Sequence, residues 1–109
     1  MKTKSAVVAL SALAQESRLE VFRLLVRTGP EGLGAGEISN RLDLGKSTLS
    51  FHLKELQHAG LIRSCRDGRN IIYSLEETGI RSLLGFLTED CCQGRDDLCL
   101  PANAQPACC

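Results

Sequence analysis

The stretch from Gly45 to Gly60, GKSTLSFHLKELQHAG, constrains the fold most, because it combines a narrow apolar stripe with an unusually polar opposite face. Leu49, Leu53 and Leu56 follow the spacing i, i+4, i+7 and therefore share one side of a helix. The first turns carry Lys46, Ser47, Thr48, Ser50, Phe51 and His52 on the other sides. A helix that enters the major groove of DNA needs small hydrogen-bonding side chains at its N-terminal end and an apolar back. An ordinary amphipathic helix with a solvated polar face has the same pattern, so the neighbouring segments must decide.

The distribution of charge favours a nucleic-acid partner. The chain has 109 residues, enough for one domain with a modest core, and its formal net charge is zero. Residues 1–88 hold twelve Lys or Arg against nine Asp or Glu, whereas residues 89–109 hold one Arg against four acids. The zero net charge thus results from a basic segment, residues 1–88, and an acidic C-terminal segment. The basic segment suits contacts with phosphates.

Two helices are expected before the glycine-rich segment GPEGLGAG. The first spans Ser5 to Ala14 and is apolar on more than one side, as a helix must be if it packs on its own domain and on a partner. Ser17 and Glu20 match a capping box, which predicts a second helix through Arg27 that ends at Gly29-Pro30. The apolar residues expected to face the core are Val7, Leu10 and Leu13 in the first helix, and Leu19, Phe22 and Val26 in the second.

The next segments predict a helix-turn-helix followed by a wing. Helices over Glu37–Leu42 and Lys46–Ala59 are separated by only a few residues, which is typical of that motif. Two β-prone runs, 61–65 and 70–74, then flank Asp67-Gly68, a strong hairpin signal. Arg66 and Arg69 lie on either side of this turn, so the tip of the hairpin is basic. A solvated hairpin whose arginines have no role remains the alternative.

A last helix and a cysteine-rich tail complete the chain. Ser74 and Glu77 repeat the capping-box pattern, and the helix that follows carries an apolar stripe formed by Ile80, Leu83, Leu84 and Leu87. That stripe is too apolar for a free terminal helix, so we expect the N- and C-terminal helices to form a homodimer about a two-fold axis. The fold class is thus mainly α with a β-hairpin wing, a winged helix-turn-helix over residues 1–88. Residues 89–109, with two prolines and four acids, are expected to be a flexible tail.

The order of these elements, together with three local motifs, resembles the ArsR/SmtB family of metal-sensing repressors. The motifs are ALAQESRLEVFRLL in the second helix, AGEISNRLDLGKSTLSFHLKELQHAGLI in the helix-turn-helix, and RDGRNIIYSL in the wing. The resemblance implies a homodimeric winged helix that binds double-stranded operator DNA and releases it when a metal or metalloid binds. In that role Ser47, Thr48, Ser50 and His52 would read the groove, with Phe51 contacting a thymine methyl or packing on the wing. Lys46, Arg66 and Arg69 would hold phosphates.

The expected inducer follows from where the cysteines lie. The resemblance does not supply a site beside the recognition helix, because Glu37–Leu44 has no cysteine, nor a histidine site on the last helix. Five of the six cysteines instead fall in the last nineteen residues. As(III) or Sb(III) takes three thiolates, which Cys91, Cys92 and Cys99 could supply. Cys108 and Cys109 form a second pair that could substitute or bind a second ion, and Cys65 is expected to be a packing residue.

Several alternatives stay open at this point. Four thiolates could hold zinc or cadmium, although the usual C-x-x-C spacing is missing, and exposed vicinal thiols could act as a redox sensor. The N-terminal sequence MKTKSAVVALSALAQ also mimics a signal peptide, which would make the chain a secreted disulfide module. We favour a cytoplasmic protein with reduced thiols, no membrane span and no enzymatic activity, because no catalytic constellation is present.

Overall fold

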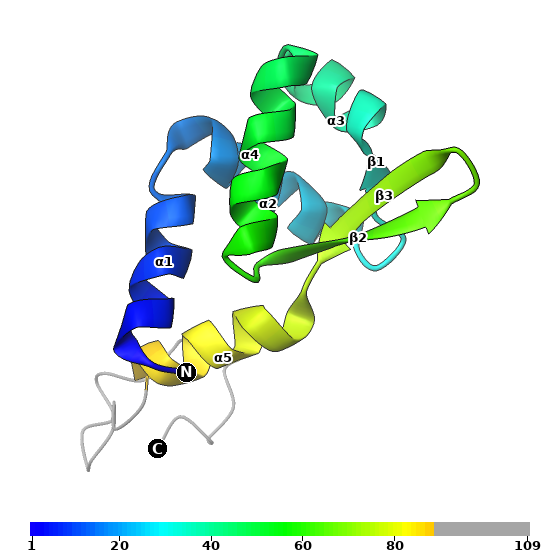
Figure 1. Cartoon of the computed structure of the whole chain (residues 1–109). Coiled ribbons are helices and arrows are strands. Elements are labelled where there is room, and N and C mark those ends of the chain that lie inside the picture. The colour runs from blue at the N-terminus through cyan, green and yellow to red at the C-terminus, as the bar shows by residue number, and fades with distance from the viewer. Residues whose placement is uncertain (89–109) are drawn as a thin grey trace.

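The computed structural model describes residues 1–88, which form five helices and a small three-stranded sheet (Figure 1). The elements in chain order are α1 (Thr3–Leu13), α2 (Glu16–Thr28), β1 (Leu33–Gly34), α3 (Ala35–Leu42), α4 (Lys46–His58), β2 (Ile62–Asp67), β3 (Asn70–Leu75) and α5 (Glu77–Thr88). The sheet is antiparallel with strand order β1-β3-β2. This architecture confirms the predicted winged helix-turn-helix. None of these five helices is long and apolar enough to cross a membrane.

Helix α4 lies at the centre of the molecule and is anchored as its sequence predicts. Leu49, Leu53 and Leu56 are each no more than 2% exposed and pack with α2, α3 and β2. The helix ends in a Schellman motif at Gly60, whose φ of 79° is left-handed. In this motif the Leu61 N–H donates to the Leu56 carbonyl at 3.1 Å and the Gly60 N–H donates to the Gln57 carbonyl at 3.0 Å.

The turn between α3 and α4 is closed by side-chain and backbone hydrogen bonds. Asp43 adopts a left-handed conformation with φ of 54° at the C-terminus of α3. The Leu44 N–H donates to the Ser39 carbonyl, and the Ser39 hydroxyl in turn donates to the Leu44 carbonyl. These two hydrogen bonds join the last turn of α3 to Leu44, which lies two residues before α4 begins.

The hairpin is confirmed, with its turn displaced by one residue from the expected position. Asp67 pairs with Asn70, so Gly68 and Arg69 are the central residues of a two-residue turn. Gly68 has a φ of 65° and Arg69 has a negative φ, the combination required by a type II′ turn. Strand β1, which pairs with β3 through Leu33 and Gly34, lies in the segment expected to be a simple glycine-rich turn.

Both predicted capping boxes are wrong. Helix α2 begins at Glu16, and the side chain of Gln15, not Ser17, accepts the hydrogen bond from the Arg18 N–H at 2.9 Å. Ser74 lies in β3, where it is buried and its Oγ accepts from Arg63 Nε at 3.4 Å. A serine that satisfies its hydroxyl within the sheet is no longer available to cap α5.

The apolar faces of α1 and α2 differ from the prediction, whereas that of α5 is divided between the core and the surface. Helix α1 packs on the body through Ala6, Ala9 and Ala12, and α2 buries Val21, Leu24 and Leu25. In α5, Leu83 is buried and Ile80 packs against the core as expected. Four apolar side chains expected to face the core are instead at least 41% exposed: Val7, Leu10, Leu19 and Val26. Leu84 and Leu87, which were expected at a homodimer interface, are 51% and 50% exposed in the single chain.

Candidate nucleic-acid interface

The polar residues predicted to read DNA stand together on the first two turns of α4. Lys46, Ser47, Thr48 and Ser50 are all exposed, and Phe51 is 56% exposed. The buried leucine stripe on the opposite side fixes which face of α4 points outward. The helix thus presents hydrogen-bonding groups and one aromatic ring on a single outer surface.

The N-terminus of α4 is also electrostatically suited to an anion. Its first turn contains no acidic residue and its N-cap, Gly45, provides no side-chain hydrogen bond to the free N–H groups. Unpaired N–H groups at a helix N-terminus carry partial positive charge and bind phosphate oxygens readily. Lys46 adds a full positive charge at the same point.

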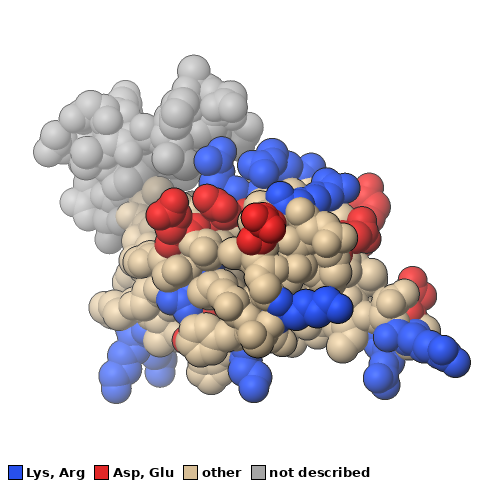
Figure 2. Space-filling view, turned by 90° about the horizontal axis from the view of Figure 1, so that it is seen from above, with Lys and Arg blue, Asp and Glu red and all other residues tan. Residues whose placement is uncertain are grey.

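The wing carries the second group of predicted residues. Arg66 and Arg69 are exposed at the end of the β2–β3 hairpin, and Lys and Arg side chains protrude at the corresponding right-hand end of the molecule in Figure 2. Gln57 Nε2 near the end of α4 donates to Ser64 Oγ on β2 at 3.1 Å. The hairpin is therefore tied to α4, so that the two basic elements are presented as one unit.

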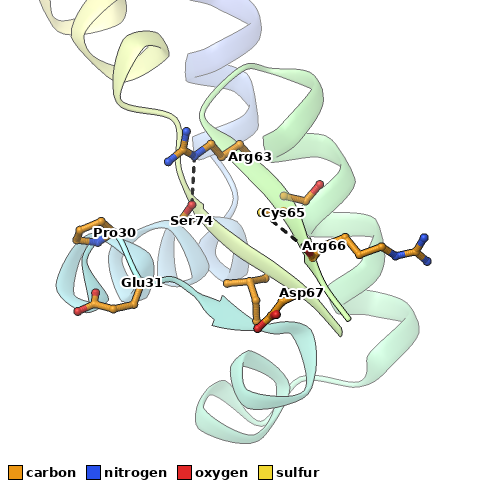
Figure 3. A pocket seen from close by; sticks show the side chains of 9 residues that line it. Pro30, Glu31, Arg63, Cys65, Arg66, Asp67 and Ser74 are labelled. Carbon is orange, nitrogen blue, oxygen red and sulfur yellow. Dashed lines mark hydrogen bonds between the residues drawn. The ribbon is translucent and has the colours of Figure 1, made fainter. Parts of the chain in front are cut away.

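A shallow hollow of about 570 Å³ lies beside the hairpin, between β2, β3 and the segment that follows α2 (Figure 3). Arg63 points toward Ser74 within this hollow, while the Arg66 side chain extends away from that pair.

Cys65 is exposed on β2. Its expected packing role is therefore wrong, because every residue of the edge strand β2 after Ile62 is exposed.

His52 does not join the exposed reading surface. Its side chain is only 6% exposed, and its Nδ1 is buried without a hydrogen-bond partner in the described part of the chain. The structure therefore does not bring His52 together with the exposed residues predicted to read the groove, and its groove contact stays a prediction. His52 follows Leu49 by three residues and precedes Leu56 by four, which places it at the edge of the buried stripe.

The sequence did not predict that Arg18 is a charged neighbour of His52. Arg18 on α2 forms an ion pair with Glu55 of α4, with Nη1 and Oε1 3.7 Å apart. Its guanidinium carbon lies 5.9 Å from the centre of the Phe51 ring. The motif containing Arg18 marked α2 as a helix but gave no sign that this side chain crosses to α4.

The environment of His52 predicts a pH-dependent stability. Burial lowers the pKa of the His52 imidazole below its ordinary value of 6.5, and the charge of Arg18 lowers this pKa further. The unfolded chain therefore takes up a proton that the folded chain resists. The free energy of unfolding is expected to fall as pH drops below about 6.5 and to level off below the folded pKa.

Urea denaturation between about pH 7.5 and pH 5.5 measures this effect, because most carboxylates remain ionised in that range. His52→Gln is expected to flatten the dependence, and His58→Gln, which keeps His52, is expected to retain it. Equal slopes for the wild type and His52→Gln would contradict the assignment.

The predicted metalloid ligands Cys91, Cys92 and Cys99, with the additional pair Cys108 and Cys109, lie outside the described residues. Within residues 1–88 no three His, Cys, Asp or Glu side chains come together in a way that could hold a metal ion.

Comparison with known proteins places the chain in a family. A model described as a helix-turn-helix domain matches residues 13–65. The transcriptional activator HlyU of Vibrio cholerae is 35% identical over 81% of this chain and 79% of that protein. An ArsR-like transcriptional regulator from Rhodococcus has a similar structure, with 25% identity, a TM-score of 0.67 and coverage of 77% of this chain and 76% of that one.

The chain belongs to the ArsR family of winged helix-turn-helix transcriptional regulators. Its likeness to HlyU extends to the solved reduced form of that protein, with 34% identity, a TM-score of 0.63 and coverage of 84% of this chain and 93% of the other. A regulator named for the arsenical resistance operon of Halobacterium salinarum is 41% identical over 58% of this chain and 48% of its own length.

Proposed function

We propose that this ArsR-family regulator is a repressor that binds operator DNA as a homodimer and is released by As(III) or Sb(III). The observation that carries the DNA-binding part is the joint exposure of the polar N-terminal turns of α4 and the basic hairpin tip. The side chains proposed to read the groove are Ser47, Thr48, Ser50 and Phe51, and those proposed to hold phosphates are Lys46, Arg66 and Arg69.

The homodimer is supported by the exposed apolar side chains of the terminal helices. Val7 and Leu10 on α1, with Leu84 and Leu87 on α5, are between 41% and 54% exposed in the single chain. These two helices meet at an angle at one end of the molecule (Figure 1). Large apolar side chains exposed on two helices that meet suit a protein interface, and a two-fold axis through it would present two α4 helices to a palindromic site.

The proposed inducer rests on the chemistry of the tail. Three thiolates suit a soft, thiophilic ion such as As(III), and Cys91, Cys92 and Cys99 would hold it. Cys91 follows the last residue of α5 by three positions. Binding there acts next to the proposed dimer helix, and a coupling of about 1–3 kcal/mol between the two sites is typical of such switches.

A redox response of the same thiols is the second candidate. The observation that favours it is the likeness to HlyU, for which a reduced form has been solved. In this case two thiols would lose two electrons and two protons to an oxidant such as peroxide and form a disulfide. Zinc or cadmium as the inducer is the third candidate, with thiolates as ligands.

A release assay with DNA from the promoter of the protein's own gene tests these possibilities. Fluorescence anisotropy under reducing conditions is expected to show release by arsenite or antimonite, and no release by zinc or cadmium at equal concentration. Cys91→Ser and Cys92→Ser are expected to bind DNA as the wild type does and to resist release, because each removes one of three ligands.

Cys65→Ser is the matched control and is expected to respond as the wild type does. Release by zinc or cadmium alone would replace the metalloid assignment. Release by peroxide in the absence of reductant, reversed by dithiothreitol, would favour the redox candidate.

A further inference from the structure

The Arg18 side chain extends from α2 to α4 and lies near two residues that are one helical turn apart. It contacts Phe51 and Glu55, which are four residues apart and so lie on the same side of α4. Phe51 is 56% exposed on the surface proposed to read DNA, whereas Arg18 has a side chain only 15% exposed. One largely buried guanidinium thus joins the outer surface of α4 to the body of the protein.

The backbone of Arg18 is held in place, and its side chain is largely buried. The Arg18 N–H is fixed by the Gln15 side chain at the start of α2, at 2.9 Å. Arg18 Nε is buried and has no hydrogen-bond partner among residues 1–88. A side chain buried to this degree has little of its charge available for a phosphate.

The leucine stripe of α4 does not by itself define the rotation of the helix. Hydrophobic packing is non-directional, so it tolerates small rotations of α4 about its axis. A planar guanidinium that stacks near one ring and pairs with one carboxylate imposes a direction. The ring of Phe51 also lies 5.8 Å from that of His52, which places the same cluster against the edge of the core.

We propose that Arg18 is a positioning residue, which sets the rotation of α4 and the orientation of the Phe51 ring without touching DNA. The inference rests on the proposed function, in which α4 reads the operator. It assigns part of the discrimination between operator and other DNA to a contact between α2 and α4. Base-edge hydrogen bonds depend steeply on geometry, so a small rotation of α4 weakens them while leaving phosphate attraction intact.

Arg18→Gln is expected to lower operator affinity by about 10-fold, within the range that one misplaced base contact costs. Affinity for random DNA and the slope of log affinity against log salt are expected to stay at the wild-type values. Arg23→Gln, an exposed arginine on the same helix, is the control for loss of one charge. Arg18→Lys, which keeps the charge and loses the planar fork, is expected to lie between Arg18→Gln and the wild type.

Three binding results would overturn the inference. A salt slope reduced by about 1 in Arg18→Gln would make Arg18 a phosphate contact. Equal loss of affinity for operator and random DNA would make its role merely structural. Wild-type discrimination in Arg18→Gln would remove any role, whereas failure of the wild-type protein to prefer its operator would overturn the proposed function itself.

NMR titration of His52 tests the contact without DNA. Removing the Arg18 charge is expected to raise the pKa of His52, because Arg18 and Glu55 are the charged groups of α2 and α4 in this cluster and Arg18 opposes protonation. Arg23→Gln is expected to leave the His52 titration unchanged. An unchanged titration in a folded Arg18→Gln protein would show that Arg18 does not lie against α4, and would overturn the inference whatever the binding data.

Discussion

Replacing Leu84 and Leu87 together with lysine is expected to convert the proposed dimer into monomers and to lower operator affinity by about 100-fold or more. The two side chains are 51% and 50% exposed in the single chain, so the substitution removes little packing within the protomer. Lysine is a good helix former and should leave α5 folded. In a dimer the added charges would meet at an apolar interface, where burying them costs several kcal/mol.

Lysine is chosen because its charge attracts DNA, so a loss of binding cannot come from electrostatic repulsion. Sedimentation velocity gives the oligomeric state and anisotropy gives the affinity for a palindromic operator. The matched control is Leu19→Lys with Val26→Lys on α2, which are 43% and 50% exposed. If the control becomes monomeric and the α5 variant stays dimeric, the dimer forms through α2 and the proposed interface is wrong.

The exposed leucines of α5 also show what a sequence pattern can predict. Periodicity identifies the helix and its apolar residues, but it does not say which of them meet the same chain. In α1 the side turned to the body carries the three alanines Ala6, Ala9 and Ala12, because small residues let a helix approach closely. The larger Val7 and Leu10 remain outside. The local sequence pattern therefore cannot tell which apolar residues pack within the chain and which remain exposed for a partner.

Helix starts were mispredicted for a different physical reason. A serine followed three residues later by glutamate satisfies the capping pattern at both Ser17 and Ser74. The structure gives the first cap to Gln15, whose longer side chain reaches the Arg18 N–H, and places Ser74 within a strand. Both outcomes depend on where the preceding segment ends, and that is decided by tertiary packing.

The candidate site was predictable where one helix defines it and unpredictable where two helices meet. The leucine stripe of α4 correctly indicates that Ser47, Thr48 and Ser50 face outward. Because His52 lies at the edge of that stripe, the sequence of α4 alone does not decide whether its side chain is buried or exposed. The packing of α2 decides it. The Arg18 contact needs the crossing of α2 and α4, which local spacing does not contain.

Gly79 near the start of α5 illustrates a close backbone approach that no sequence motif marks. A Cβ atom built on Gly79 would collide with the carbonyl oxygen of Gly60. Gly60 lies two residues after the end of α4, and the adjoining Leu61 carbonyl accepts from the Glu76 N–H at 2.9 Å. The start of α5 is therefore pressed directly against the C-terminal end of α4.

Gly79→Ala is expected to lower the free energy of unfolding by about 1–3 kcal/mol, because rigid backbone must move to admit the methyl group. Gly85→Ala on the same helix, where an added Cβ meets no atom within 4 Å, is expected to raise it by about 0.5–1 kcal/mol through helix propensity. Urea denaturation at one fixed protomer concentration measures both, since dimer stability depends on concentration. The opposite signs matter, because two stabilising substitutions would mean that α5 does not approach Gly60 so closely.

Displacing α5 from α4 should also change the spacing of the two recognition helices, so Gly79→Ala is expected to lose operator affinity even under conditions where it is fully folded.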